Sequence, residues 1–215
     1  MRREQTNVVA PLLAVLLIGA ACPPQSLAQR PQQPTLPLPE VTSETNQLPE
    51  QPLWNSVRAW HYNPQMVRPL WDVWAAFEEP PLSMRMKLMV ATVTDSRNRC
   101  PYCLSSAVCY LESEGLSGDH ILQLQADIAA SDFSAKEKTL LLLAERMTVD
   151  PSSAHAQVGP ALAAGWTEAE VAQAIFVVAY FNMLNRIAEA FALPPDVDHQ
   201  FDPAPEFPFL QCGAS

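Results

Sequence analysis

Glycine is scarce in this chain, with six glycines against 21 prolines among 215 residues. Sheet proteins need glycine at tight turns, whereas proline is tolerated at helix starts and between helices, so this balance disfavours a sandwich or a barrel. Hydrophobic residues still make up 48% of the chain, which is enough to form a core in one domain. The composition predicts a mostly helical protein with a proline-rich appendage.

Basic residues and histidine clusters are also lacking. The chain has 13 Lys and Arg against 23 Asp and Glu, and no basic stripe, so its surface repels phosphate backbones and nucleic acid is excluded as a partner. The four histidines, His61, His120, His155 and His199, are scattered. A zinc site at a cysteine pair would need two more ligands at matching spacing, so we expect no metal.

The N-terminus has the pattern of a secretory signal peptide. Arg2 and Arg3 precede an apolar run from Val8 to Ala21, which is too short to span a bilayer, and small residues precede a cleavage point after Ala28. We therefore expect residues 1–28 to be removed, no stable membrane span, and a periplasmic or secreted protein. An incomplete lipoprotein box before Cys22 makes lipid anchoring the alternative.

Three further regions follow. Residues 29–53 are rich in Pro and Gln and have few apolar side chains, which predicts an extended, disordered and poorly packed linker. Residues 54–197 are expected to form one helical domain. Residues 198–215 are expected to form a C-terminal tail that packs loosely.

Helix start and stop signals recur through the domain. Ser134–Glu137 and Thr167–Glu170 are capping boxes, and Gly115 and Gly165 are stop signals. We predict an all-α bundle of about six to seven helices. They run from about 64 to 79, 84 to 97, 101 to 115, 117 to 128, 134 to 150, 153 to 164 and 167 to 193.

The last of these helices is apolar almost all round from Val171 to Tyr180, which predicts a place in the core. Asn182, Asn185 and Arg186 interrupt the apolar run. Because buried polar groups must be hydrogen-bonded, we interpret them as a structural network that ties helix ends together.

One pair of residues indicates chemistry: Cys100 and Cys103, in the segment Cys100-Pro101-Tyr102-Cys103. Two cysteines three apart at a helix start place both sulfurs on one face and can form a disulfide within one turn. The first cysteine lies at the capping end, where free N–H groups and the helix dipole lower the pKa of a thiol. The pattern predicts a redox pair, and the alternative is an inert disulfide. Tyr102 is interpreted as a lid or a packing residue.

Cys109 lies nine residues after Cys100, half a turn away from the face of the pair. Two interpretations stay open for it. It is either a free, buried, small hydrophobic residue or one half of a disulfide with Cys212.

Three segments resemble a known family: ATVTDSRNRCPYC from Ala91, KEKTLLLLAERMTVDP from Lys136, and GWTEAEVAQAIFVVAYFNMLNRIAEAFAL from Gly165. Together they resemble the carboxymuconolactone decarboxylase / alkylhydroperoxidase AhpD-like superfamily, above all its peroxidase-related branch, over His61 to Asp196. The resemblance implies an all-α fold around an antiparallel helical core, homo-oligomers, and peroxide reduction by the cysteine pair without metal, haem or other cofactor. Decarboxylase members generally lack the pair.

Two positions depart from the family pattern. Active members have a glutamate twelve residues before the first cysteine and a histidine four residues after the second, and this chain has Leu88 and Ala107 there. In the family these residues deprotonate the second cysteine, so the resemblance implies that Cys103 attacks and Cys100 resolves. Considered without the family, Cys103 has no base and Cys100 keeps the helix dipole, which makes Cys100 the expected better thiolate.

The sequence therefore predicts an exported thiol redox enzyme that reduces peroxides slowly or exchanges disulfides, with a peroxide or disulfide as substrate and a reductant of unknown identity. General-base help contributes about 10²–10⁴ in rate, so its loss should weaken peroxide attack. Thiol–disulfide exchange needs only an accessible thiolate. The alternative is a catalytically inactive scaffold or binding protein with a structural disulfide.

Overall fold

The computed structural model describes residues 31, 33–42, 45, 48 and 54–196, together with the backbone of residues 199–203 and 208–212. The predicted signal peptide, its cleavage point and Cys22 lie outside the described residues. The boundaries predicted for the linker, the domain and the tail stay predictions.

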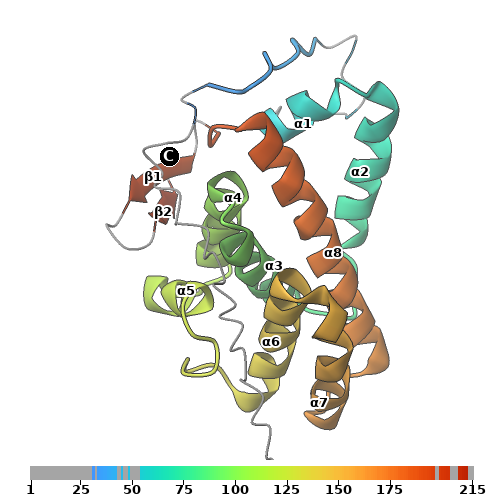
Figure 1. Ribbon diagram of the computed structural model, residues 1–215, viewed down its shortest axis with the longest axis vertical. Coiled ribbons are helices and arrows are strands. Elements are labelled where there is room, and N and C mark those ends of the chain that lie inside the picture. The colour runs from blue at the N-terminus through green and yellow to red at the C-terminus, as the bar shows by residue number, and fades with distance from the viewer. Residues whose placement is uncertain are drawn as a thin grey trace, which may run out of the picture. The chain divides into compact units, whose positions relative to one another are not determined.

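Residues 54–196 are built from helices and contain no strand, which confirms the all-α prediction (Figure 1). After them, β1 (His199–Pro203) and β2 (Pro208–Cys212) pair antiparallel, with His199 opposite Cys212. The helices are α1 (Asn55–Trp60), α2 (Pro64–Ala76), α3 (Met84–Asn98), α4 (Pro101–Ser113), α5 (Gly118–Gln125), α6 (Ala135–Val149), the 3₁₀ helix η2 (Pro151–Gln157), α7 (Val158–Ala163) and α8 (Glu168–Phe191).

The capping signals act as predicted. In both capping boxes, at the starts of α6 and α8, the hydroxyl accepts from the backbone and the glutamate accepts in return. Gly115 and Gly165 have φ values of +80° and +91°, the left-handed conformation that favours glycine. The segment predicted as one helix from 153 starts instead as the 3₁₀ helix η2. Pro160 lacks an N–H and is tolerated only in a first helical turn, which delays the α-helix to Val158.

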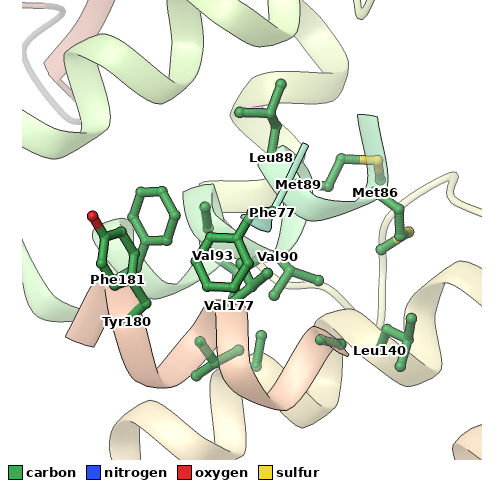
Figure 2. Close-up of a cluster of buried hydrophobic side chains, with 14 of the residues drawn as sticks. Phe77, Met86, Leu88, Met89, Val90, Val93, Leu140, Val177, Tyr180 and Phe181 are labelled. Carbon is green, nitrogen blue, oxygen red and sulfur yellow. The ribbon is translucent and has the colours of Figure 1, made fainter. Parts of the chain in front are cut away.

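α3 is the central helix of the domain. Every residue from Met86 to Asp95 is buried, and the helix packs against α4, α6 and α8. Figure 2 shows its side chains with those of Leu140 from α6 and of Val177 and Phe181 from α8. α8 is long and apolar enough to cross a membrane by length and composition, and here it packs on this core. Only part of the surface of α8 is buried, although its sequence predicted a helix buried almost all round, because α3 and not α8 occupies the centre of the core.

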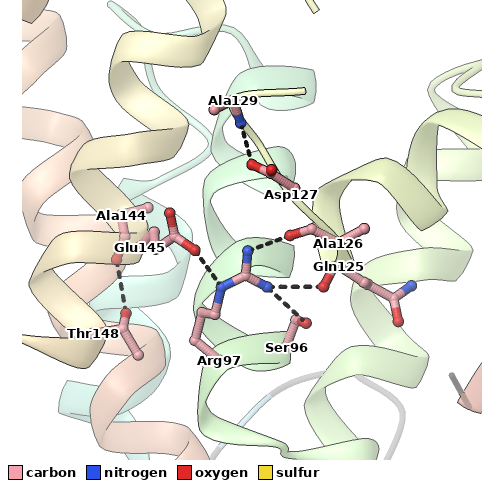
Figure 3. Close-up of polar contacts among 9 residues, drawn as sticks. All are labelled: Ser96, Arg97, Gln125, Ala126, Asp127, Ala129, Ala144, Glu145 and Thr148. Atoms are coloured by element: carbon pink, nitrogen blue, oxygen red, sulfur yellow. Dashed lines mark hydrogen bonds and ion pairs between the residues drawn. The ribbon is translucent and has the colours of Figure 1, made fainter. Parts of the chain in front are cut away.

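Arg97 fixes the end of α3 that leads to the cysteine pair (Figure 3). Its guanidinium donates to the carbonyl oxygens of Gln125 at 2.9 Å and Ala126 at 2.7 Å, at the C-terminus of α5. Its Nε also pairs with Glu145 of α6 at 2.7 Å. A cation at a helix C-terminus satisfies carbonyls that have no partner within the helix, so Arg97 holds three helices together.

Residues 33–42, the N-terminal strap, are extended as predicted, but they are not poorly packed. Thr35 donates through its backbone N–H to Phe191 at 2.8 Å and through its hydroxyl to Ala190 at 2.9 Å, at the end of α8. Arg58 of α1 donates to the Pro39 carbonyl. The expectation of a loose linker is wrong for this part, because the strap satisfies carbonyls that a helix C-terminus leaves free.

Candidate redox site

The cysteine pair lies where the chain turns from α3 into α4. Arg99 has left-handed backbone angles, φ 56° and ψ 43°, and its N–H donates to the carbonyl of Ser96 at 3.0 Å. The N–H of Cys100 donates to the carbonyl of Asp95, also at 3.0 Å. These two bonds form a Schellman motif, which ends α3 and lets Cys100 cap α4 as predicted.

The two sulfurs lie on the same face of the first turn of α4. Cys100 and Cys103 are both free thiols, and the N–H of Cys103 donates to the sulfur of Cys100 at 3.4 Å. Their access to solvent differs. Cys100 is 0% exposed and Cys103 is 7% exposed.

The expectation that the helix dipole gives the Cys100 thiol a low pKa is wrong. Burial raises the pKa of the Cys100 thiol well above its ordinary value, the neighbouring Cys103 thiol raises it further, and the charge of Asp95 adds to the rise. The N–H of Cys103 at the helix start lowers it, as the dipole argument predicts, but this is the smallest of the effects. Desolvation of a charged sulfur outweighs one N–H contact.

Cys103 lines an apolar pocket, and Cys100 does not. The pocket lies between α1, α2, α3, α4 and α8, and its wall is largely aromatic. The aromatic residues that line it are Trp54, Trp60, Trp71, Trp74, Tyr102, Tyr110, Tyr180 and Phe181.

Leu88 and Ala107, which stand at the family's glutamate and histidine positions, line the same pocket as Cys103. No Asp, Glu, His or Lys is among the pocket's lining residues. Burial raises the pKa of the three lining tyrosines, so none of them is a base at neutral pH. Among the described residues, moreover, no group of three or more His, Cys, Asp or Glu could hold a metal ion.

Tyr102, between the two cysteines, ties elements together. Its hydroxyl donates to Asp196 at 2.8 Å, after α8, and lies 3.1 Å from the hydroxyl of Ser56 in α1. Its side chain is buried and its hydroxyl is hydrogen-bonded, as expected of a packing residue, and it also lines the pocket of Cys103.

The polar residues of α8 form the predicted network. The amide of Asn98 donates to Asn182 at 3.0 Å and to Asn185 at 2.7 Å, which joins α3 to α8. Asn185 then donates to Oδ1 of Asp95 at 2.6 Å. Arg186 donates to the Asn182 side chain at 2.9 Å.

The sequence reasoning missed Asp95, where this network ends. Its carboxyl is 0% exposed, its Oδ2 has no hydrogen-bond partner in the described part of the chain, and burial raises its pKa well above 3.8. A signal was present in the sequence, because Asp95 follows the uncharged stretch from Leu88 to Thr94 and precedes Cys100 by five positions.

Cys109 is disulfide-bonded, so the interpretation as a free, buried cysteine is wrong. The side chain of Cys212 lies outside the described residues. The pairing of Cys109 with Cys212 therefore stays a prediction.

No protein-family model and no curated protein matches this sequence. Solved structures do. A peroxidase-related protein from Silicibacter sp. TM1040 has a TM-score of 0.66 at 22% identity, over 80% of this chain and 96% of that one. An uncharacterized peroxidase-related protein with an alkylhydroperoxidase AhpD core, from Ralstonia eutropha JMP134, has a TM-score of 0.65 at 17% identity, over 76% and 93%.

A third similar structure is that of an enzyme with a different activity. The debrominase Bmp8, as a cysteine-to-alanine variant in complex with 2,3,4-tribromopyrrole, has a TM-score of 0.65 at 17% identity, over 76% of this chain and 92% of that one. These likenesses show that the chain has the AhpD-like fold, and the predicted fold is confirmed.

Proposed function

We propose that this protein is a thiol oxidoreductase in which Cys103 attacks the substrate and Cys100 resolves the product as a disulfide. One observation carries the proposal: Cys103 lines the apolar pocket, while Cys100 lies fully buried beside it. An attacking thiol has to reach its substrate, whereas a resolving thiol has to reach only the first sulfur.

The proposed catalytic cycle has three steps. The Cys103 thiolate attacks a hydroperoxide, the O–O bond breaks, and Cys103 becomes a sulfenic acid, while the alkoxide takes up the proton that Cys103 lost and leaves as an alcohol. Cys100 then attacks the Cys103 sulfur, so that the disulfide forms and water leaves. A dithiol reduces the disulfide, is itself oxidised, and returns both cysteines to thiols.

The lining of the pocket argues for slow peroxide attack and for apolar substrates. None of its residues can take the proton of Cys103 at neutral pH, so the general-base contribution of about 10²–10⁴ is missing. Its aromatic wall favours an organic hydroperoxide over hydrogen peroxide, because burial of apolar surface drives binding. Disulfide exchange, which needs no base in the pocket, is the activity least affected.

A second candidate function is reductive dehalogenation of an aromatic ring. The aromatic wall of the pocket favours it, and a debrominase with this fold binds a tribromopyrrole. In that reaction the C–Br bond becomes C–H, bromide leaves with a proton, and Cys100 and Cys103 supply two electrons by forming their disulfide. An inactive scaffold with a structural disulfide is the remaining alternative.

Turnover measurements separate these functions. Cumene hydroperoxide, hydrogen peroxide and tribromopyrrole would each be supplied with dithiothreitol to the wild type, Cys103→Ser, Cys100→Ser and the control Ser113→Ala, an exposed change at the far end of α4. We expect Cys103→Ser to be inactive. With dithiothreitol left out, Cys100→Ser should consume one equivalent of cumene hydroperoxide and leave a sulfenic acid that dimedone traps. A pair that stays oxidised in dithiothreitol, or equal turnover in all variants, would overturn the proposal.

A further inference from the structure

A second cavity lies beside the pocket of Cys103 and is larger than it. Its volume is about 330 Å³, against about 80 Å³ for the pocket of Cys103, and small-molecule sites span roughly 300–1,000 Å³. The two spaces have part of their walls in common, and the residues that line both are Trp54, Trp71, Trp74, Leu88 and Tyr110. One ligand can therefore occupy the second cavity and reach towards Cys103.

Four aromatic rings line the second cavity. Three of the five tryptophans of the chain are among them, together with Tyr110. Trp54 precedes α1 and Trp71 is on α2, and their ring centroids are 6.3 Å apart, so the two rings form one continuous surface. The three tryptophans are half-buried and Tyr110 is 37% exposed. Part of the ring surface is therefore open to a ligand.

Two carboxylates, Glu78 and Glu114, line the same cavity. Among the residues that the structure describes, neither carboxylate forms an ion pair, and the lining of the cavity includes no Lys, Arg or His. Burial, Asp196 and then the charge of Glu78 raise the pKa of Tyr110, so the Glu78 carboxylate acts on the aromatic wall. The cavity thus combines aromatic faces with two uncompensated negative charges.

Both glutamates follow the C-terminus of a helix. Glu78 comes two residues after the end of α2, and Glu114 directly follows α4. A helix C-terminus carries a partial negative charge, and neither last turn contains a basic residue, so a carboxylate is electrostatically unfavourable there. Lys87 lies near the end of α2, but its buried ammonium donates to the carbonyl oxygens of Phe77 and Glu79, and it does not line the cavity.

An alkylated ammonium group fits this combination. A cation over the face of a Trp or Tyr ring is attracted by the ring quadrupole, and a quaternary ammonium needs no hydrogen bonds from its site. An ammonium with N–H groups would lose hydrogen bonds to water that aromatic faces do not replace. A calcium ion would need six to eight oxygen ligands, more than two carboxylates supply.

We propose that the second cavity binds the alkylated ammonium group of a substrate whose apolar part extends into the pocket of Cys103. The assignment of this ligand as a substrate rests on the proposed function. Glu78 and Glu114 balance the positive charge, and the tryptophan rings contact the alkyl groups on the nitrogen. The apolar part then carries the reacting group to the Cys103 sulfur.

Binding of a matched pair of probes tests the proposal. Phenyltrimethylammonium and tert-butylbenzene have the same shape, but the first has a charged nitrogen where the second has a neutral carbon. Each would be titrated into the reduced protein and followed by tryptophan fluorescence. We expect Glu78→Gln with Glu114→Gln to weaken phenyltrimethylammonium binding about fivefold at low salt, because two carboxylates near the cation are lost. The affinity for tert-butylbenzene should not change.

Glu112→Gln with Glu168→Gln is the matched control. It changes the net charge by the same amount, but Glu112, on α4, and Glu168, in the first turn of α8, do not line the cavity. It should bind both probes as the wild type does. Equal phenyltrimethylammonium affinity in the wild type and the Glu78→Gln, Glu114→Gln variant, or an equal loss in the control, would overturn the proposal.

Protection of Cys103 tests the connection between the cavity and the thiol. A fixed concentration of phenyltrimethylammonium should slow the labelling of Cys103 by the neutral reagent N-ethylmaleimide, as peptide mass spectrometry would show. The slowing should be smaller in the Glu78→Gln, Glu114→Gln variant. Binding that leaves the labelling rate of Cys103 unchanged would overturn the proposal.

These measurements also separate the inference from the proposed function, because they use no peroxide and no turnover. A protein that binds the cation and protects Cys103, but turns over no hydroperoxide, would keep the cation site and remove the proposed function. An active peroxidase that binds phenyltrimethylammonium equally well with and without the two carboxylates would keep the function and remove the cation site.

Discussion

Among single residues, the contrast between Cys100 and Cys103 carries most of the proposed chemistry. They are the same residue type three positions apart, yet one is enclosed and the other lines the pocket. Leu88 and Ala107 add to this contrast, because they place apolar groups in the pocket where a base would act on Cys103. The site is therefore suited to a thiol whose reactivity depends on the substrate more than on an internal base.

Restoring the relay should speed up peroxide attack. Leu88→Glu together with Ala107→His places a carboxylate and an imidazole in the pocket of Cys103, and an imidazole titrates close to neutral pH. We expect the rate of peroxide reduction at pH 7 to rise about tenfold or more, the lower part of the general-base range. Stopped-flow measurement of Cys103 oxidation checks this.

The matched control is Leu88→Gln with Ala107→His, which keeps the volume of the glutamate without its charge. Leu88→Glu alone should lower stability, because it buries an unpaired charge. A wild type that already reacts as fast as the double variant would show that another residue is the base.

Asp95 should make folding stability fall with pH. Burial raises its pKa above the ordinary 3.8, so between that pH and its folded pKa the folded state holds a proton that the unfolded state has lost. Stability is then highest below the unfolded pKa and falls as pH rises. Asp95→Asn should be more stable than wild type at pH 8, with the difference shrinking towards pH 5, as urea denaturation of the reduced proteins would show.

Asp150→Asn is the control for this measurement. The pKa of Asp150 is lowered, chiefly by hydrogen bonds from Ser153 and Ser152, so its contribution is lost only in acid and does not change between pH 5 and pH 8. If the Asp95→Asn and wild-type curves ran parallel over that range, Asp95 would not hold a proton in the folded state.

At the scale of elements, the N-terminal strap has the most specific consequence. Leu38 packs against the small cluster that contains Cys100, Cys103 and Leu193, while Leu36, two residues earlier, is 49% exposed. The strap therefore covers one side of the thiol pair as well as the end of α8.

We expect Leu38→Ser to expose the pair and to destabilise the protein by about 1 kcal/mol, the cost of losing part of a buried apolar contact. The reduced variant should also react faster than wild type with a thiol-specific fluorophore. Leu36→Ser is the matched control and should behave as wild type. Equal labelling rates for Leu38→Ser and Leu36→Ser would show that the strap does not protect the thiols.

For the whole molecule, we predict a homo-oligomer. The apolar run of α6 does not support this, because Leu140, Leu141 and Leu143 are buried within the protomer. α8 does, since Phe176 is 66% exposed and Met183, two turns further on the same face, is 36% exposed.

Light scattering at micromolar concentration should give a mass above that of the 23.7 kDa chain, and Phe176→Asp should lower it. Val73→Asp, a change at a 42% exposed residue of α2, serves as the comparison. A wild type that scatters as a monomer would contradict the prediction.

Export is the second prediction at this scale, and it concerns residues outside those the structure describes. Mass spectrometry of the protein recovered from its native host should find Gln29 at the N-terminus, since small residues precede a cut after Ala28. An acylated N-terminus at Cys22 would instead establish the lipid-anchored alternative.

Much of the fold could be predicted because its signals are local. The capping boxes at Ser134 and Thr167 act within one helical turn and mark α6 and α8 correctly. α1 was missed because it is short and its N-cap, Trp54, makes no side-chain capping bond. α5 was predicted to run to residue 128 but ends at Gln125, where Ala126 leaves helical geometry although Ile128 is still buried.

For the site, too, the features with local signals could be predicted from the sequence and the others could not. The spacing of Cys100 and Cys103, the helix start between them and the lack of a glutamate and a histidine are properties of neighbouring residues, and the sequence alone was enough to identify them. The acidity of Cys100 was predicted with the wrong sign, and Asp95 was not recognised. Both depend on desolvation, which arises when α3, α4, α8 and the strap pack together. Segments far apart in the chain supply that packing, so local spacing does not contain it.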